Sequence, residues 1–253
     1  MDCGLFSYFC SDNKPIPMEI NELENISSQV RRDIIRMVAG VKSGHPGGSL
    51  GCADFFTCMY FEVMDLDPNN WDMDGVGEDV FFLSNGHISP VLYSTLAHRG
   101  YFPKEELGTF RLLNTRLQGH PSTSHHLPGV RIASGSLGQG MSVAIGTALA
   151  KKLNGDQKLV YSLHGDGEIQ EGQIWEAAMY AAANKVDNLI CTIDYNHKQI
   201  DGDIDDVLPL GDLVQKWQAF GWTVLEMDGH DHQNILETME KAKRLTGRGK
   251  PIM

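Results

Sequence analysis

The sequence is poor in three features that would each indicate a particular class of protein: cysteine, positive charge and long apolar runs. Its five cysteines, at positions 3, 10, 52, 58 and 191, lack the spacing of a metal site or of a disulfide framework, so we expect reduced, mostly buried thiols in a cytoplasmic protein. Lysine and arginine number 21 against 33 acidic residues, and the resulting charge of −12 disfavours binding to nucleic acid or to an anionic membrane. No stretch is apolar for the roughly 20 residues that a membrane-spanning helix needs.

The first residues also lack the pattern of a targeting signal. Residues 1–17 have no basic start, no long apolar core and no small-residue cleavage site. We expect them to form a disordered extension, followed by a single domain over residues 18–253. With 42% hydrophobic residues, that domain can bury one large core.

What the sequence does contain is an alternation of short apolar runs and helical patterns. An amphipathic helix is predicted from Glu19 to Val41, ended by Gly44 and Pro46, and Ser89 with Pro90 is predicted to cap and begin a later helix. Apolar strand patterns occur in residues 79–87, 159–163, 188–196 and 222–227, and further helical patterns in residues 52–64, 135–153, 174–184, 212–220 and 232–245. This order predicts an α/β fold with a doubly wound, mainly parallel sheet and helices on both faces.

The stretch HGDGEIQEG, residues 164–172, joins one of these strands to a helix. Gly165 and Gly167 let the backbone approach a ligand closely, and Asp166 places a carboxylate beside the free N–H groups of a helix start. The same turn also occurs where the aspartate only caps the helix. Asn196 ends the next predicted strand, and in a right-handed βαβ unit both strand ends emerge at one edge of the sheet. Carboxylate and amide oxygens there suit Mg²⁺ and a diphosphate.

A Gly-Asp-Gly turn followed one strand later by asparagine resembles the motif that binds thiamine diphosphate (ThDP). Further phrases narrow the resemblance to the N-terminal, diphosphate-binding domain of the transketolase family. They are SGHPGGSLG (43–51), LSNGH (83–87), GHP (119–121), GSLGQG (135–140) and DGEIQEG (166–172), in the order and spacing of that domain. The resemblance runs from about Met18 to Met253 and implies the ThDP-binding fold.

The resemblance also implies roles for individual residues. Asp166, Asn196 and the main-chain carbonyl of Lys198 would bind Mg²⁺, and His45, His87 and His120 would hydrogen-bond the sugar and relay protons. The residues implied to contact the cofactor are His87, Gly135, Leu137, Gly165, Asp166, Gly167, Glu171 and Asn196.

For several of these positions the residues themselves leave a structural alternative open. A histidine in a glycine-proline loop is more often structural, the loop at residues 135–140 can be a plain turn and helix start, and acids such as Glu171 and Glu176 are expected at a helix start from the helix dipole. His120 together with His125 and His126 could also suggest zinc, although no element fixes their geometry and cysteine partners are absent.

The activity implied by the resemblance is that of a ThDP- and Mg-dependent transferase of the pentose phosphate pathway. It would move a two-carbon ketol unit from a ketose phosphate to an aldose phosphate. The pyrimidine-binding domain, which supplies the activating glutamate in the family, is not in these residues, so we expect an N-terminal subunit that works with a C-terminal transketolase subunit, as a homodimer or heterotetramer. In the family, a histidine near the diphosphate follows the counterpart of residues 250–253, so we expect either that residues beyond Met253 complete the site or that the site is completed differently.

Two alternatives belong to other classes. One is a related ThDP enzyme half with a different sugar, such as a branched-pentose transketolase or a deoxyxylulose-phosphate synthase. The other is a half that binds diphosphates, or only dimerises, without turnover.

Overall fold

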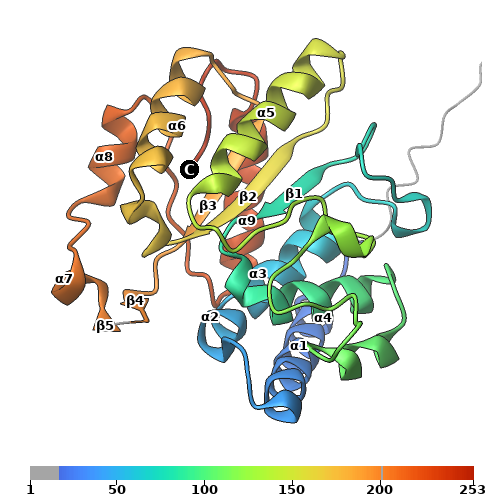
Figure 1. The fold of residues 1–253 in the computed structure, drawn as a ribbon. Coiled ribbons are helices and arrows are strands. Elements are labelled where there is room, and N and C mark those ends of the chain that lie inside the picture. Colours follow the sequence, from blue (N-terminus) through green and yellow to red (C-terminus); the bar gives the residue numbers. More distant parts are fainter. Residues whose placement is uncertain (1–16, 201) are drawn as a thin grey trace, which may run out of the picture.

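A parallel sheet runs through the middle of the molecule (Figure 1). The computed structural model describes residues 17–200 and 202–253, so that the expected extension, except for Pro17, lies outside the described residues. Strands β1 (Val80–Leu83), β2 (Val160–Gly165) and β3 (Leu189–Asp194) lie in that order. All three carboxyl ends therefore emerge at the same edge.

Beyond β3 the sheet continues through single bridges. Ile252 bridges Ile190 on one side and Thr223 on the other, both in parallel. The N–H groups of Thr223 and Leu225 donate to Pro251 and Met253 over 3.0 and 2.9 Å. The strand predicted at residues 222–227 thus adjoins the sheet but pairs over fewer residues than predicted, because its hydrogen bonds go only to residues 251–253.

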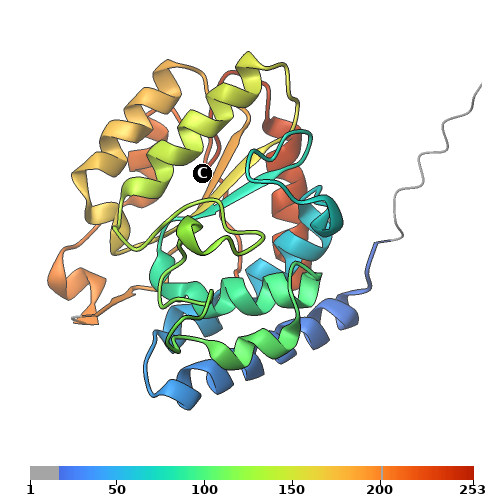
Figure 2. The same cartoon turned by 45° about the vertical axis from the view of Figure 1, so that its right-hand side comes forward.

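Helices cover both faces of the sheet, as the predicted doubly wound fold requires (Figure 2). One face packs against α1 (Ile20–Val41), α3 (Ala53–Cys58), α4 (Ser89–Arg99) and α9 (His232–Leu245), and the other against α5 (Gln139–Leu153), α6 (Gly172–Ala183) and α8 (Leu213–Ala219). The remaining elements are α2 (Pro46–Gly51), α7 (Ile204–Val207), β4 (Lys198–Gln199), β5 (Gly202–Asp203), the π-helix η1 (Met59–Val63), and the 3₁₀ turns η2 (Pro68–Asn70), η3 (Gly86–Ile88), η4 (Lys104–Thr109), η5 (Thr123–His125) and η6 (Glu168–Gln170).

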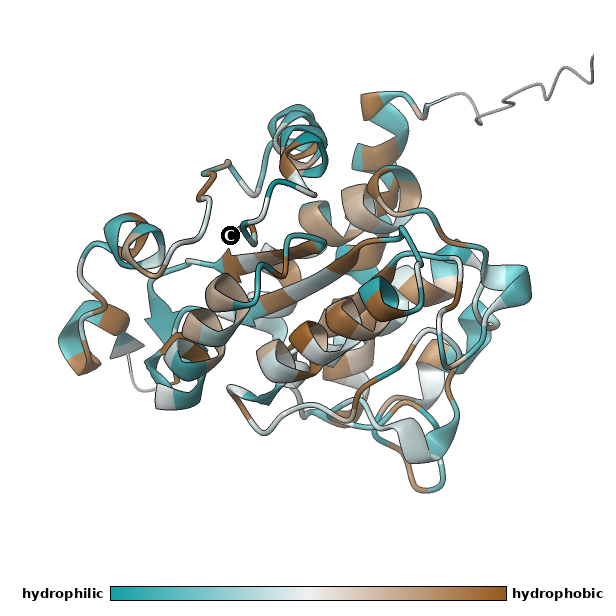
Figure 3. Ribbon diagram, turned by 90° about the horizontal axis from the view of Figure 1, so that it is seen from above, coloured by the Kyte–Doolittle hydropathy of each residue, from teal (hydrophilic) through white to brown (hydrophobic). Residues whose placement is uncertain are grey.

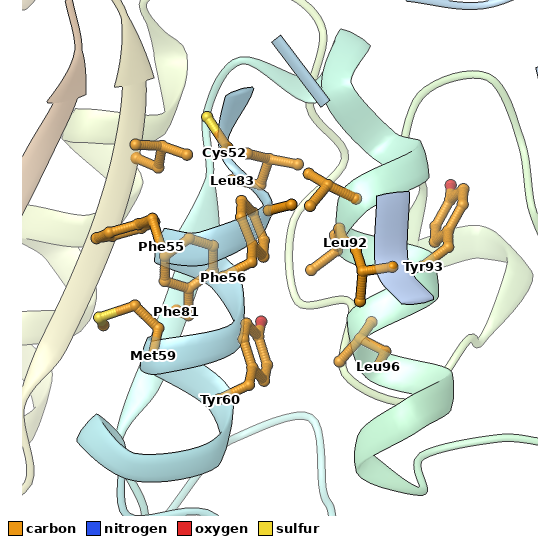
Figure 4. Packing of buried hydrophobic residues seen from close by; sticks show 14 of the residues in the cluster. Cys52, Phe55, Phe56, Met59, Tyr60, Phe81, Leu83, Leu92, Tyr93 and Leu96 are labelled. Carbon is orange, nitrogen blue, oxygen red and sulfur yellow. The ribbon is translucent and has the colours of Figure 1, made fainter. Parts of the chain in front are cut away.

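Alternation along the strands divides the core into two layers. Phe81 and Leu83 of β1 point toward α1, α3, α4 and α9, whereas Val80 and Phe82 point toward α5 and α6. In the first layer the ring of Phe56 meets Phe81 edge to face at 5.4 Å, as the close view shows (Figure 4). Apolar residues accordingly follow the strands and the inner sides of the helices (Figure 3).

The structure corrects three details of the predicted helix ends. Helix α1 ends at Val41 as predicted, but Lys42 in the left-handed conformation (φ 52°) ends it, two residues before Gly44. Pro46 begins the short helix α2 instead of excluding one, since its ring fits the first helical turn. Ser89 is the first residue of α4 and not its cap, and its hydroxyl donates to the carbonyl of Gly119 over 2.8 Å.

Two simpler expectations concern membranes and cysteines. Among the described residues, no helix is both long and apolar enough to cross a membrane. Cys52, Cys58 and Cys191 are free and buried, which confirms the expected buried thiols at these positions, while Cys3 and Cys10 lie outside the described residues.

Candidate functional site

The candidate site lies where the three parallel strands end, and a glycine turn follows β1 there. A Cβ atom added to Gly86 would lie 2.4 Å from the hydroxyl oxygen of Ser134 and 2.7 Å from its carbonyl carbon. Only glycine therefore allows the turn after β1 to touch the loop before α5. The same turn reaches β2, since a Cβ at Gly165 would meet the amide nitrogen of Asn85 at 3.6 Å.

The three histidines that the sequence selected come together at this edge. His45 caps α2, His87 lies in η3 and His120 lies in the loop before η5, yet the ring centroid of His45 is 5.3 Å from that of His87 and 6.5 Å from that of His120. Burial lowers the pKa of His87, His45 and His120 lower it further, and the charge of Glu168 partly offsets them. Burial, with Arg111 and His45, also lowers the pKa of His120. Both rings are therefore neutral near pH 7.

Zinc binding by the histidines of this loop receives no structural support. Within residues 17–200 and 202–253, no group of three or more histidine, cysteine or acidic side chains is arranged to hold a metal ion. His125 closes η5 and His126 adopts a left-handed backbone conformation with φ of 50°.

Asp166 is almost completely buried, with 2% of its surface exposed. Its carboxylate accepts the N–H of Gly167 over 2.8 Å and that of His197 over 2.7 Å, and its own N–H donates to the carbonyl of Asp194. Burial raises the pKa of Asp166, the two backbone N–H groups counteract this, and the nearby Asp194 adds to the rise. A cation beside Asp166 would remove that electrostatic cost.

Asn196 and Lys198 lie in the turn that holds Asp166. The side-chain oxygen of Asn196 accepts the N–H of Lys198 over 2.8 Å, and its amide nitrogen donates to Asp194 over 2.8 Å. Lys198 belongs to β4, with its amine 2.6 Å from Asp203. The structure thus places the three predicted metal ligands around one turn, although Asn196 uses both ends of its amide within the protein.

Asp194 is a residue that the sequence reasoning missed. Burial raises its pKa, and hydrogen bonds from Cys52, over 3.4 Å, and from Asn196 offset part of that rise. Its position as the last residue of β3, two before Asn196, was the available signal.

The predicted cofactor contacts in the glycine loop lie beside His120. Gly135 has a φ of 120°, and a Cβ there would lie 2.6 Å from the His120 ring. The carbonyl of Leu137 accepts the side-chain amide of Gln173 over 3.2 Å. Gly167 lies next to Gln199, whose side-chain oxygen would be 3.1 Å from an added Cβ.

Glu171 and Glu176 lie at the exposed start of α6. Glu171 occupies the cap position, but its side chain makes no capping hydrogen bond. Large apolar side chains are exposed on the same helix and on α5, with Met179 54%, Tyr180 52% and Val143 40% exposed. Helices with apolar outer faces are typical of surfaces that another chain covers.

Asp54, in α3, is a buried carboxylate held by hydrogen bonds. The guanidinium of Arg31 donates to both of its oxygens, over 2.7 and 2.5 Å. Burial alone would raise the pKa of Asp54, but the Arg31 pair outweighs it and the pKa is lowered. The carboxylate is therefore held ionised by a structural partner.

Buried oxygen atoms without partners at the strand ends indicate a place for a bound ligand, and the metal candidates suit a hard metal ion. The buried oxygens Oδ1 of Asn85 and Oγ of Ser134 have no hydrogen-bond partner among the described residues, and both flank the turns that carry His87 and Gly135. Buried polar atoms without partners are uncommon and mark places where a ligand or water completes the structure. The metal candidates offer only oxygen, which is the donor that Mg²⁺ prefers.

The close packing of α5 on the end of β1 yields a testable prediction. A Cβ at Gly140 would lie 2.4 Å from the Cβ of Ser84, so Gly140→Ala is expected to lower the free energy of unfolding by about 1–3 kcal/mol. Gly146→Ala on the same helix is the matched control, because an added Cβ there meets nothing within 4 Å, and it should stabilise by about 0.4–1 kcal/mol. Urea unfolding measures both; equal effects would contradict the close approach.

Comparisons with known proteins agree with this geometry. The sequence profile described as "Transketolase, thiamine diphosphate binding domain" matches residues 23–253. The 6-deoxy-6-sulfo-D-fructose transketolase subunit of Clostridium sp. (strain MSTE9) is 41% identical over 92% of this chain and 82% of its own length. An apulose-4-phosphate transketolase subunit of Actinobacillus succinogenes is 38% identical over 94% of this chain and 84% of its own length.

The fold of this chain is also similar to that of solved transketolase structures. The transketolase of Campylobacter jejuni superposes with a TM-score of 0.83 at 34% identity, covering 93% of this chain. This chain spans 37% of that longer chain.

Proposed function

The chain belongs to the transketolase family through its thiamine diphosphate binding domain, and from that premise we propose that it is the N-terminal subunit of a two-chain, Mg-dependent transketolase. The enzyme transfers a two-carbon ketol unit from a ketose phosphate to an aldose phosphate in the cytoplasm. The observation that carries this proposal is the meeting of His45, His87 and His120 at the sheet edge where Asp166 lies.

The metal and the diphosphate are held at the ends of β2 and β3. Asp166, Asn196 and the carbonyl of Lys198 bind Mg²⁺, which relieves the buried charge of Asp166. The main chain at Gly165 and Gly167 approaches the diphosphate, and Gly135, Leu137, His87 and Glu171 contact the rest of the cofactor. When bound, ThDP supplies the electron sink that stabilises the two-carbon unit during transfer.

The histidines act on the sugar. The neutral rings of His87 and His120 accept hydrogen bonds from sugar hydroxyls and can take up a proton at a ring nitrogen, because burial keeps their pKa values below the usual range. His45 faces both rings and completes the group. The histidines thus orient the substrate and move its protons.

A second chain completes the enzyme. The C-terminal subunit supplies the pyrimidine-binding domain, and the enzyme assembles as a homodimer or heterotetramer. Both bacterial relatives described above are named as transketolase subunits, and the exposed apolar residues of α5 and α6 provide a surface for such contacts.

A sulfosugar is a second candidate for the donor substrate. The relative with 41% identity is named for 6-deoxy-6-sulfo-D-fructose, whose terminal group is a sulfonate. A sulfonate and a phosphate monoester are both anions of similar shape, so the same active site can serve a sulfosugar.

The assembly proposal predicts that this chain alone is folded but has no ketol transferase activity. A mobile thiazolium ring, held only at its diphosphate end, is not oriented toward the sugar in advance. The assay compares the chain alone, the chain with its partner protein, and a C-terminally extended chain with that partner, each with a ketose phosphate and with 6-deoxy-6-sulfofructose as donor. Robust turnover by the purified chain alone would refute the two-chain proposal.

A further inference from the structure

Glu168 is a buried acid at the centre of the strand ends, and it is not among the residues that hold metal, cofactor or sugar in the proposed function. It lies in η6, directly after the Gly-Asp-Gly turn, and only 1% of its surface is exposed. An acid so deeply buried requires partners, because an isolated carboxylate in the interior would be protonated.

Its partners come from three different segments. One carboxylate oxygen accepts the hydroxyl of Ser84, at the end of β1, and the N–H of Gly138 over 2.8 Å, before α5. The other oxygen accepts the N–H of Gly165 over 3.1 Å, at the end of β2, and lies 3.7 Å from Nδ1 of His164. One side chain therefore joins the ends of two strands and the glycine loop.

The chemistry of this cluster favours an ionised acid. Three of its neighbours donate hydrogen bonds, and an ionised carboxylate is a pure acceptor. Burial alone would raise the pKa of Glu168, but His164 together with the donors from Ser84 and Gly138 outweighs burial, so that the pKa is lowered. Ser84 also links Glu168 to the first turn of α5, because its hydroxyl oxygen accepts the N–H of Gly140 over 3.1 Å.

Each joined segment carries residues of the proposed site. His87 follows Ser84 in the turn after β1, Leu137 precedes Gly138, and Asp166 follows Gly165. The hydrogen bonds of Glu168 therefore link the segments that carry the proposed sugar, cofactor and metal residues.

We propose that Glu168 is a positioning residue that fixes these three turns relative to one another. The kinetic part of this inference rests on the proposed function, whereas its structural part does not. Its charge acts on His87 against two other groups: His45 and His120 both disfavour a proton on His87, and Glu168 favours one. Neutralising Glu168 should therefore lower the pKa of His87 further.

The structural part can be tested on the chain itself. In Glu168→Gln, which keeps the shape but places a donor where an acceptor is needed, we expect the amides of Gly138 or Gly165 to exchange with solvent at least about tenfold faster, measured by NMR. The imidazole signal of His87, identified with a His87→Gln variant, should titrate at lower pH. Unchanged exchange at both glycines together with an unchanged His87 titration would overturn the inference.

Two further variants separate positioning from general stability. Asp79 is also a buried acid that accepts two backbone N–H groups, from Asp65 and Leu159, but at the opposite edge of the sheet. Asp79→Asn should destabilise the chain without changing the Gly138, Gly165 or His87 signals.

Glu168→Asp keeps the charge but shortens the side chain. The His87 titration should therefore change less than in Glu168→Gln, while the amides of Gly138 and Gly165 still exchange faster than in the unmutated chain. If Glu168→Gln does not fold, Ser84→Ala is the alternative variant, because it removes one hydrogen-bond donor to Glu168. Faster exchange of the Gly138 amide in Ser84→Ala then supports the inference, and unchanged exchange overturns it.

The kinetic part uses the assembled enzyme. Glu168→Gln should raise the Kd for ThDP with Mg²⁺ about tenfold or more and shift the acid limb of the kcat/KM profile, with a smaller change in the KM for the sugar. An unchanged Kd and pH profile would overturn this part. Absence of activity from the unmutated assembly would instead refute the proposed function, and the amide exchange would still decide whether Glu168 positions the turns.

Discussion

Asp166→Ala is expected to abolish Mg²⁺-dependent ThDP binding in the assembled enzyme, with an affinity loss of at least about 100-fold. The substitution removes the only negatively charged side chain among the three proposed metal ligands, and Asn196 alone is too weak a ligand. It also leaves the N–H groups of Gly167 and His197 without their acceptor, so the turn that carries Asn196 loses its attachment to β2.

Calorimetric titration with ThDP and Mg²⁺ measures this effect. Asn196→Ala should behave similarly. Asp65→Ala is the control, because the Asp65 side chain is 70% exposed and pairs with Lys158 on the surface. An affinity for ThDP that stays the same in Asp166→Ala would remove Asp166 from the metal site.

His120→Ala is expected to reduce turnover by about 100-fold or more while ThDP affinity changes little. His120 is proposed to act on the sugar, and its ring is the most exposed of the three and lies against Gly135. Alanine there removes the proton carrier without touching Asp166 or its turn.

Steady-state kinetics and titration of ThDP on the same preparation separate the two effects. His125→Ala, in the same loop, is the matched control and should leave both unchanged. Equal losses of turnover and ThDP affinity in His120→Ala would move His120 from the sugar to the cofactor.

The sequence predicts elements best where the determinants are local. Helix α9 has the predicted bounds, His232 to Leu245, because Asp231 caps it by accepting the N–H of Asn234 and its apolar residues follow the helical period. The predicted strand at residues 222–227 is less regular, since its pairing depends on Ile252, which is distant in sequence.

The residues of the candidate site can likewise be divided into those that a local sequence pattern predicts and those that depend on distant contacts. The Gly-Asp-Gly turn and Asn196 could be selected from strand ends and ligand chemistry, but the choice of His45, His87 and His120 came from the family resemblance. Glu168 was missed because its contacts with Gly138 and Ser84 span 30 and 84 residues, so no local pattern marks them. Its environment exists only in the folded chain.

The separation between the anchored turns and the loop that carries His120 has a consequence for engineering the substrate range. His120, which we propose to act on the sugar, lies in the loop of residues 110–133. That loop provides no hydrogen-bond donor to Glu168, whereas Ser84, Gly138 and Gly165 all do. A directed-evolution library for new donor sugars can therefore randomise that loop, apart from His120, and keep the three anchoring residues constant. Variants from such a library should lose cofactor loading less often than variants randomised at the turns.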